Sequence, residues 1–168
     1  MKNISVPGEA DFNLLVEKVA AGLQSKGWTM ASAESCTGGW IAKCCTDRAG
    51  SSAWFERGYV TYSNAAKQEL LGVDGAVLDR AGAVSRGVAL QMAEQGRQRA
   101  GVDICVAVTG IAGPDGGTPE KPVGSVWFGW SLRDRTEAEL LRFTGDRDAV
   151  RRQTVAHALA GLIERIGS

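Results

Sequence analysis

Residues 103–108 form a run in which every position after Asp103 is apolar, and the run ends in Thr109 and Gly110. Such a run is typical of a strand that is buried on both faces, because a strand with one exposed face shows polar residues at every second position. Strands of this kind lie in sheets that helices cover on both sides. This strand therefore predicts an α/β domain with a central sheet.

The order of the remaining elements indicates how that sheet is built. Apolar residues at helical spacing predict helices over 10–25, 40–47, 65–71, 146–166 and from a Ser85 cap to about residue 100. Apolar and β-branched runs predict strands over 28–33 and 55–62, and a hairpin formed by 125–132 and 138–143. We expect Asn64 to cap the helix at 65–71, and residues 72–82 to be irregular. Helices alternate with strands early and a hairpin comes late, which predicts a three-layer α/β/α domain with a mixed β-sheet.

The charge balance and the positions of the cysteines limit the partners and the cellular compartment that we expect for this protein. Among 168 residues, 19 basic side chains balance 19 acidic ones, so no overall charge attracts nucleic acid or an anionic membrane. No signal-peptide pattern opens the chain, and no apolar run approaches the ~20 residues that span a bilayer. The cysteines lie in apolar or helical segments, which favours reduced thiols. We expect a cytoplasmic protein without nucleic-acid or membrane partners, with a flexible leader at 1–9 and one domain at 10–168.

A polar, glycine-rich segment follows the predicted strand at 28–33, namely Glu34-Ser35-Cys36-Thr37-Gly38-Gly39. In open α/β sheets, ligands bind at the carboxyl ends of strands. Backbone N–H groups at the start of the next helix can hold an oxyanion or a phosphate near the Ser35 hydroxyl. Taken alone, the segment is explained more simply by Ser35 or Thr37 capping that helix.

Two further segments follow predicted strands in the same way. Lys67 lies in the first turn of a helix, where burial can lower its pKa from ~10.4 toward 7–8 and make it a base for a serine. On its own, a solvated helix lysine explains this position better. Residues 109–117 (Thr-Gly-Ile-Ala-Gly-Pro-Asp-Gly-Gly) suggest backbone that approaches a ligand closely, although a structural loop explains them equally well.

Residue counts argue against histidine and metal chemistry. The only histidine, His157, is offset from the apolar stripe of the last helix, which predicts a solvated side chain. A Ser-His pair would have to use it, and nothing in the sequence places it near Ser35. One histidine and no Cys-x-x-Cys pair argue against a zinc site, so we expect no metal. Cys36 remains a rival nucleophile beside Ser35.

Five motifs occur in order from about Ala10 to the end of the chain. They are Glu34-Ser35-Cys36-Thr37-Gly38-Gly39, Tyr62-Ser63-Asn64 with Lys67, Gly82-Ala83-Val84-Ser85, Thr109-Gly110-Ile111-Ala112-Gly113-Pro114, and Phe143-Thr144-Gly145-Asp146-Arg147 followed by Val150-Arg151. Together they resemble the CinA carboxy-terminal domain family. Any one of these motifs is a weak signal, whereas five in sequence are a strong one.

The resemblance implies a nicotinamide-nucleotide amidohydrolase, which converts nicotinamide mononucleotide and water to nicotinate mononucleotide and ammonia in pyridine-nucleotide salvage. The family's nucleophilic serine falls on Ser35 and its lysine base on Lys67, with Tyr62 as a further catalytic candidate. The substrate-binding candidates are Glu34, Thr37, Gly38, Gly39, Thr109, Gly110 and Arg147. Glu34 is expected to offset the pyridinium charge, and Arg147 or a glycine-rich turn to meet the phosphate. The resemblance also implies that no cofactor is needed and that the protein is a homo-oligomer.

Two other classes of function stay open at this point. The first is a nucleotide-binding module that performs no hydrolysis. The second is an interaction domain that regulates a competence or damage response. The presence of both Ser35 and Lys67 argues against the two alternatives, because a protein that only binds has no need of a nucleophile and its base.

Overall fold

The computed structural model describes residues 5–167, and its centre is a five-stranded sheet with the strand order β2-β1-β3-β4-β5. The strands are β1 (Met30–Glu34), β2 (Phe55–Val60), β3 (Ile104–Gly110), β4 (Ser125–Ser131) and β5 (Thr136–Arg142). Strand β1 is parallel to β2 and β3, whereas β4 is antiparallel to β3 and β5. The predicted mixed sheet with a late hairpin is confirmed.

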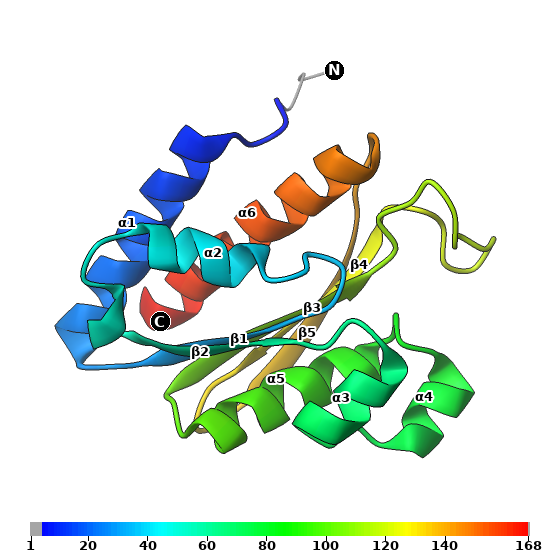
Figure 1. Ribbon diagram of the computed structural model, residues 1–168, viewed down its shortest axis with the longest axis horizontal. Helices are drawn as coiled ribbons and strands as arrows, with labels where there is room; N and C mark the ends of the chain where they lie inside the picture. The colour runs from blue at the N-terminus through cyan, green and yellow to red at the C-terminus, as the bar shows by residue number, and fades with distance from the viewer. Residues whose placement is uncertain (1–4, 168) are drawn as a thin grey trace.

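Helices cover both faces of this sheet, as Figure 1 shows. One layer contains α1 (Glu9–Lys26), α2 (Trp40–Asp47) and α6 (Arg147–Gly167), and the other contains α3 (Asn64–Leu71), α4 (Gly75–Ala81) and α5 (Arg86–Ala100). A short 3-10 helix at Ser51–Ala53 precedes β2. The predicted three-layer α/β/α architecture is therefore confirmed.

Strand β3 shows why the sheet has two helical layers. Its fully buried side chains alternate between two apolar cores. Ile104, Val106 and Val108 pack in the core that contains α1 and α6, whereas Cys105 and Ala107 pack in the core that contains α5. Burying a large aliphatic side chain contributes about 1.5–3 kcal/mol, so both layers gain stability from one strand.

Two glycines allow helices to approach the sheet closely. A Cβ atom on Gly129 of β4 would collide with the carbonyl oxygen of Ala89 in α5. A Cβ atom on Gly161 of α6 would collide with the ring of Trp130, which is fully buried and donates its Nε1–H to the Ala158 carbonyl at 3.3 Å. The distances between the layers thus depend on the absence of side chains at these two positions.

The segment 72–82 is not irregular throughout, which corrects the prediction. Residues 75–81 form α4, because the Asp74 carboxylate accepts a hydrogen bond from the Ala76 N–H at 2.9 Å and Leu78 is buried beneath the helix. The glycine at the first helical position hid this element, because glycine is a poor helix former.

Most strand and helix boundaries differ from the prediction by one or two residues, and two helix starts are informative. The cap of α3 is Ser63 rather than Asn64, because the Ser63 hydroxyl accepts a hydrogen bond from the Ala66 N–H at 3.0 Å. At the start of the chain, α1 begins at Glu9, inside the segment predicted as a flexible leader. Residues 1–4 of that predicted leader lie outside the described residues.

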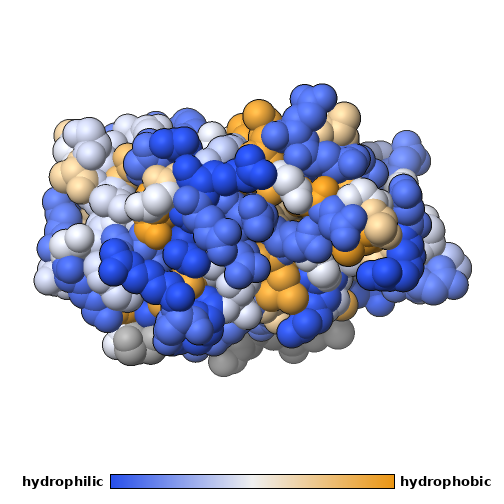
Figure 2. Space-filling model, turned by 90° about the horizontal axis from the view of Figure 1, so that it is seen from below, coloured by the Kyte–Doolittle hydropathy of each residue, from blue (hydrophilic) through white to orange (hydrophobic). Residues whose placement is uncertain are grey.

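The outer surface of the α3–α4–α5 layer is mostly hydrophilic, as seen from below in Figure 2. Hydrophobic residues appear on this face as small, separate patches, which is expected for helices that bury one apolar stripe. Within residues 5–167, no helix combines the length and the apolar character that crossing a bilayer requires.

Candidate active site

Ser35 is the first residue after β1, at the carboxyl ends of the parallel strands β1 and β3. Its backbone N–H donates to the Val108 carbonyl at 3.0 Å, so the pairing of the two strands continues one residue beyond β1. Only 8% of Ser35 is exposed. The central sheet therefore fixes the backbone that carries this hydroxyl.

Lys67 approaches Ser35 from the first turns of α3. Only 1% of Lys67 is exposed, and its Nζ lies 3.0 Å from Ser35 Oγ. The same Nζ donates to the carbonyl oxygens of Thr61 at 2.8 Å and Tyr62 at 3.1 Å. None of these three partners carries a formal charge. Burial lowers the pKa of Lys67 below its ordinary value, because the ammonium loses hydration without gaining a counter-ion.

The contacts of Lys67 suit a neutral amine. A neutral amine has two N–H bonds and one lone pair, and a carbonyl oxygen can only accept. As an ammonium, Lys67 donates to all three partners; as a neutral amine, it donates to the Thr61 and Tyr62 carbonyls and its lone pair is left for the Ser35 hydroxyl proton. The 3.0 Å separation lies within the range of about 2.6–3.2 Å for a nucleophile and its base.

Glu34 holds the start of α2 instead of facing a ligand. Its fully buried carboxylate accepts hydrogen bonds from the Thr37 hydroxyl at 2.7 Å and from the N–H groups of Ile41 and Ala42 at 2.8 and 3.0 Å. It caps α2 because the N-cap residue, Gly39, has no side chain for that purpose. Burial raises the pKa of Glu34, and these hydrogen bonds partly offset the shift. The predicted role beside a pyridinium charge does not fit, because both carboxylate oxygens are engaged inside the protein.

Arg151 of α6 contacts the turn after Ser35 from the other helical layer. Its Nε and Nη2 donate to the carbonyl oxygens of Cys36 and Thr37, each at 3.1 Å. Its guanidinium carbon also lies 5.0 Å from the centre of the Trp40 ring. Arg151 belongs to the last of the five sequence motifs, but no role was predicted for it. The available signal was its position four residues after Arg147, which places both arginines on one face of α6.

A pocket of about 190 Å³ lies over the Ser35 hydroxyl. Its lining joins all three predicted catalytic residues with three predicted substrate-binding residues, and the full set is Ser35, Cys36, Tyr62, Lys67, Ala83, Val84, Thr109, Gly110, Ala112 and Arg147. The Thr109 hydroxyl donates to the Ala83 carbonyl at 2.9 Å and so ties β3 to the segment before α5. Three further lining residues, Ala83, Val84 and Ala112, were not predicted as site residues. Each of them nevertheless belongs to one of the five sequence motifs.

Three residues predicted to bind substrate lie on the other side of the turn. Thr37, Gly38 and Gly39 line a separate pocket of about 350 Å³ beside Trp40, which shares no residue with the Ser35 pocket. Gly38 and Gly39 have φ angles of 61° and 97°, values that favour glycine, so they shape the turn. Their predicted contact with a substrate at Ser35 does not fit this placement.

Arg147 and Tyr62 meet at the mouth of the Ser35 pocket. Arg147 donates from Nη1 to the Gly113 carbonyl at 2.8 Å and from Nη2 to the Tyr62 hydroxyl at 3.3 Å. Tyr62 is 63% exposed. Both partners are neutral, and no carboxylate within residues 5–167 forms an ion pair with Arg147. The mouth of the pocket therefore presents a positive charge that an anionic group of a ligand can meet.

Cys36 lies in the pocket lining beside Ser35 but is a poor nucleophile there. Burial raises the pKa of its thiol to about 12. The thiol therefore stays protonated at neutral pH, and a cysteine attacks as its thiolate. The electrostatics of the pocket favour the Ser35 hydroxyl over the neighbouring thiol.

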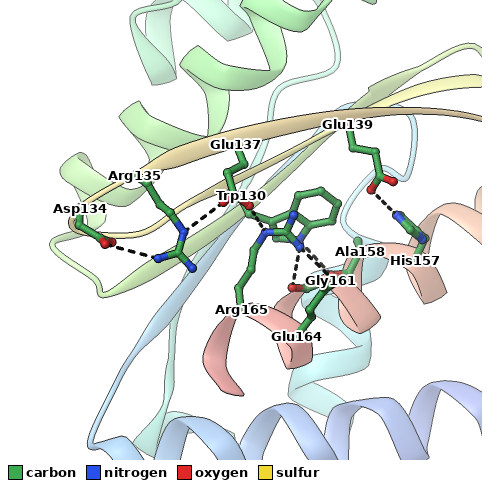
Figure 3. Close-up of polar contacts among 10 residues, drawn as sticks. All are labelled: Trp130, Asp134, Arg135, Glu137, Glu139, His157, Ala158, Gly161, Glu164 and Arg165. Atoms are coloured by element: carbon green, nitrogen blue, oxygen red, sulfur yellow. Dashed lines mark hydrogen bonds and ion pairs between the residues drawn. The ribbon is translucent and has the colours of Figure 1, made fainter. Parts of the chain in front are cut away.

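His157 lies away from this pocket, between α6 and the β4–β5 hairpin (Figure 3). Its Nε2 is 2.9 Å from Glu139 Oε2, and its ring packs edge-on against Phe128 with 4.6 Å between the ring centroids. The prediction of a solvated histidine holds only in part, because 31% of the side chain is exposed and the rest packs between α6 and the hairpin. Among the described residues, no group of three or more His, Cys, Asp or Glu side chains is placed to hold a metal ion.

Known proteins match this chain over most of its length. The CinA C-terminal domain family matches residues 13–166. This chain belongs to that family. A nicotinamide-nucleotide amidohydrolase PncC from Enterobacter agglomerans is 56% identical over 143 residues, which cover 84% of this chain and 87% of that relative. The protein of the same name from Escherichia coli K12 is 52% identical over 156 residues, which cover 92% and 94% of the two chains.

The CinA fold is also present in solved structures. The competence/damage inducible protein CihA from Agrobacterium tumefaciens matches with a TM-score of 0.91 and 42% sequence identity, over 98% of this chain and 99% of that one. The fold predicted from the order of helices and strands is therefore confirmed. The CinA family predicted from the five motifs is confirmed as well.

Proposed function

We propose that this protein hydrolyses the carboxamide of nicotinamide mononucleotide to nicotinate mononucleotide and ammonia by a Ser-Lys mechanism. One observation carries the mechanism: Lys67 Nζ, buried beside neutral partners, lies 3.0 Å from Ser35 Oγ. The substrate follows from the relatives named nicotinamide-nucleotide amidohydrolase at 56% and 52% identity. The proposal includes a cytoplasmic role in pyridine-nucleotide salvage.

In the first half of the reaction, neutral Lys67 removes the proton of the Ser35 hydroxyl. The Ser35 oxygen bonds to the carboxamide carbon, whose oxygen becomes an oxyanion. The resulting Lys67 ammonium donates its proton to the departing nitrogen, the C–N bond breaks, and ammonia leaves an ester on Ser35. Lys67 returns to its neutral form without any other proton donor.

The second half repeats these proton transfers with water. Lys67 takes a proton from water as the water oxygen bonds to the ester carbon. The bond between that carbon and the Ser35 oxygen then breaks, and the Lys67 proton returns to Ser35. The product is the carboxylic acid, and the lowered pKa of Lys67 supports both halves because the amine must be neutral when each begins.

The oxyanion needs donors next to Ser35, and the turn limits the choice of backbone N–H groups. The Ser35 N–H donates to the Val108 carbonyl, and the Gly38 N–H donates to the Ser35 carbonyl at 3.1 Å. Within residues 5–167, the Cys36 N–H donates to no acceptor on another residue, and its own thiol is the one group it interacts with. Cys36 also lines the pocket, so its N–H is the donor that we assign to the oxyanion.

The size of the pocket indicates how a nucleotide is held. Its volume of about 190 Å³ is below the range of about 300–1,000 Å³ for sites that enclose a whole small molecule. The pyridine carboxamide therefore occupies the pocket, and the ribose phosphate lies at its mouth beside the Arg147 guanidinium. Arg147 suits this role because a guanidinium donates two parallel hydrogen bonds to a phosphate.

The test is ammonia release by purified protein from nicotinamide mononucleotide, with nicotinamide riboside as the control that lacks the phosphate. We expect turnover of the mononucleotide with and without a chelator, because no step of the mechanism uses a metal. Arg147→Ala should raise KM for the mononucleotide about 10-fold or more, the loss of roughly 1.4 kcal/mol or more. The same change should leave KM for the riboside nearly unaltered.

Failure to turn over would point to one of the alternative functions. If well-folded protein binds nicotinamide mononucleotide in a calorimeter but releases no ammonia, the chain is a nucleotide-binding module. If it neither binds nor hydrolyses the mononucleotide, the proposed substrate is wrong.

A further inference from the structure

Arg151 does not line the Ser35 pocket, yet its guanidinium is directed at the turn that follows Ser35. It donates to the Cys36 and Thr37 carbonyls, each at 3.1 Å, and it forms no ion pair with a carboxylate within residues 5–167. It lines the pocket beside Trp40 and not the Ser35 pocket. Its hydrogen bonds therefore reach the Ser35 pocket through the backbone of the turn.

The hydrogen bonds of the turn form a chain that starts at Arg151. The Thr37 carbonyl accepts from Arg151 Nη2, and the N–H on the opposite side of that peptide, at Gly38, donates to the Ser35 carbonyl at 3.1 Å. A trans peptide holds its C=O and N–H in opposite directions, so the Ser35 peptide directs its own N–H, at Cys36, away from Gly38. Two peptide groups in series thus connect the guanidinium to the Cys36 N–H.

We propose that Arg151 is a positioning residue for amide hydrolysis, acting through these two peptides to aim and polarise the Cys36 N–H as the oxyanion donor. This inference rests on the proposed function. A positive charge at one end of a hydrogen-bond chain strengthens each later donor, because every bond polarises the next. The effect is largest when negative charge develops on the substrate oxygen, so it should act on the transition state more than on substrate binding.

The neighbouring residue provides a matched control. The Arg152 guanidinium lies 5.2 Å from the same Trp40 ring, but its Nε pairs with Asp148 at 2.7 Å and it does not contact the turn. Arg151→Ala and Arg152→Ala therefore each remove one guanidinium beside Trp40, and only the first removes the donors to the turn.

Steady-state kinetics with nicotinamide mononucleotide test the proposal. We expect Arg151→Ala to lower kcat by about 10- to 100-fold, less than the 10²–10³-fold loss of an oxyanion donor itself, with KM within about 3-fold of its original value. Arg152→Ala should keep kcat within about 2-fold. Added ethylguanidinium should restore part of the kcat of Arg151→Ala and should not change that of Arg152→Ala.

A binding measurement separates this role from a purely structural one. Pyridine-3-boronic acid should form a bond from Ser35 Oγ to boron as the Ser35 proton moves to Lys67, which gives an anionic tetrahedral boronate with a hydroxyl oxygen in the oxyanion position. Arg151→Ala should weaken this inhibitor as much as it lowers kcat, while the affinity for nicotinate mononucleotide stays unchanged. If Arg151→Ala does not fold, Arg151→Lys takes its place, since a lysine keeps the charge and loses the paired donors.

Two results would overturn the inference: equal kcat for the Arg151 and Arg152 variants, or equal weakening of boronate and product binding by the Arg151 change. Absence of turnover by the unaltered protein would overturn the proposed function instead. In that case, the comparison of boronate and product binding still tests the role of Arg151.

Discussion

The Lys67 site and the edge formed by β5 and α6 both gather charged side chains, but only the β5–α6 edge pairs them. There, Glu137 accepts from Arg165 at 2.9 Å and from Arg135 at 3.1 Å, and Glu139 pairs with His157 (Figure 3). These carboxylates are exposed to water. Lys67 has no charged partner, and almost none of its surface is exposed.

The difference explains why we assign the proposed chemistry to the Lys67 site and not to the β5–α6 edge. An exposed ion pair contributes about 0–1 kcal/mol, because water screens it and solvates each partner. A buried lysine without a counter-ion costs stability and releases its proton more easily. Burial thus costs stability and lowers the pKa of Lys67, as is frequent for perturbed groups at functional sites.

The largest expected effect comes from removing the nucleophile or its base. Ser35→Ala and Lys67→Met should each lower kcat for nicotinamide mononucleotide by about 10³-fold or more, because neither step of the mechanism then has its reacting group. Lys43→Met is the matched control, since Lys43 is exposed and pairs with Asp47 at 2.7 Å. Circular dichroism should show all three variants folded. Activity in Ser35→Ala would end the assignment of the nucleophile.

The pH dependence should show the same contrast between paired and unpaired charge. Because Lys67 must be neutral to act, kcat/KM should rise about tenfold per pH unit and level off at the lowered pKa of Lys67, below the ordinary ~10.4. Between these two pKa values the unfolded chain binds more protons than the folded one, so stability should rise with pH. Lys67→Met should lack this rise in denaturant titrations, and an equal rise in both proteins would contradict the assignment.

Glu34 and Glu139 allow a comparison of a buried carboxylate with an exposed one. Glu34→Gln should reduce the free energy of unfolding by about 1–3 kcal/mol, because its amide cannot replace both acceptor oxygens at the start of α2. Glu139→Gln removes one exposed ion pair with His157 and should cost about 0–1 kcal/mol. Urea denaturation of both variants measures the difference. Equal losses would show that burial of Glu34 does not decide its contribution.

Cys36 tests whether position beside the nucleophile is enough for reactivity. With its pKa at about 12, the thiol should resist iodoacetamide at neutral pH, and Cys36→Ala should keep most of kcat. A small loss of stability is expected from the smaller buried side chain. Loss of turnover in Cys36→Ala together with full turnover in Ser35→Ala would reverse the assignment.

The smallest expected effect is at His157. His157→Gln should leave kcat and its pH profile unchanged, because the imidazole lies against Phe128 and Glu139 and not in the Ser35 pocket. The ion pair with Glu139 is partly exposed, so its loss should cost about 0–1 kcal/mol. A change in the pH profile of kcat/KM would show that this region takes part in the reaction after all.

Local sequence patterns were sufficient to predict most of the fold. The apolar run that begins β3 predicted a strand buried on both faces, and its side chains do alternate between two cores. The pattern failed at α4, where Gly75 concealed a helix that the Asp74 cap and the burial of Leu78 stabilise. Tertiary packing thus outweighed the local propensity of a helix whose first residue is glycine.

By itself, the sequence determined the class of fold and the family, and it predicted Ser35 and Lys67 as nucleophile and base, because residue types in a fixed order are local information. Tertiary structure alone decided which polar residues face the ligand. Glu34, one residue before Ser35, points into the protein and caps α2, whereas Arg151, more than a hundred residues later, reaches the turn that follows Ser35. Adjacent residues at the end of a strand project to opposite faces, and residues far apart in the chain meet only when helices pack on a sheet. The spacing of residues in the sequence therefore predicts neither the direction of the Glu34 side chain nor the contact between Arg151 and the turn.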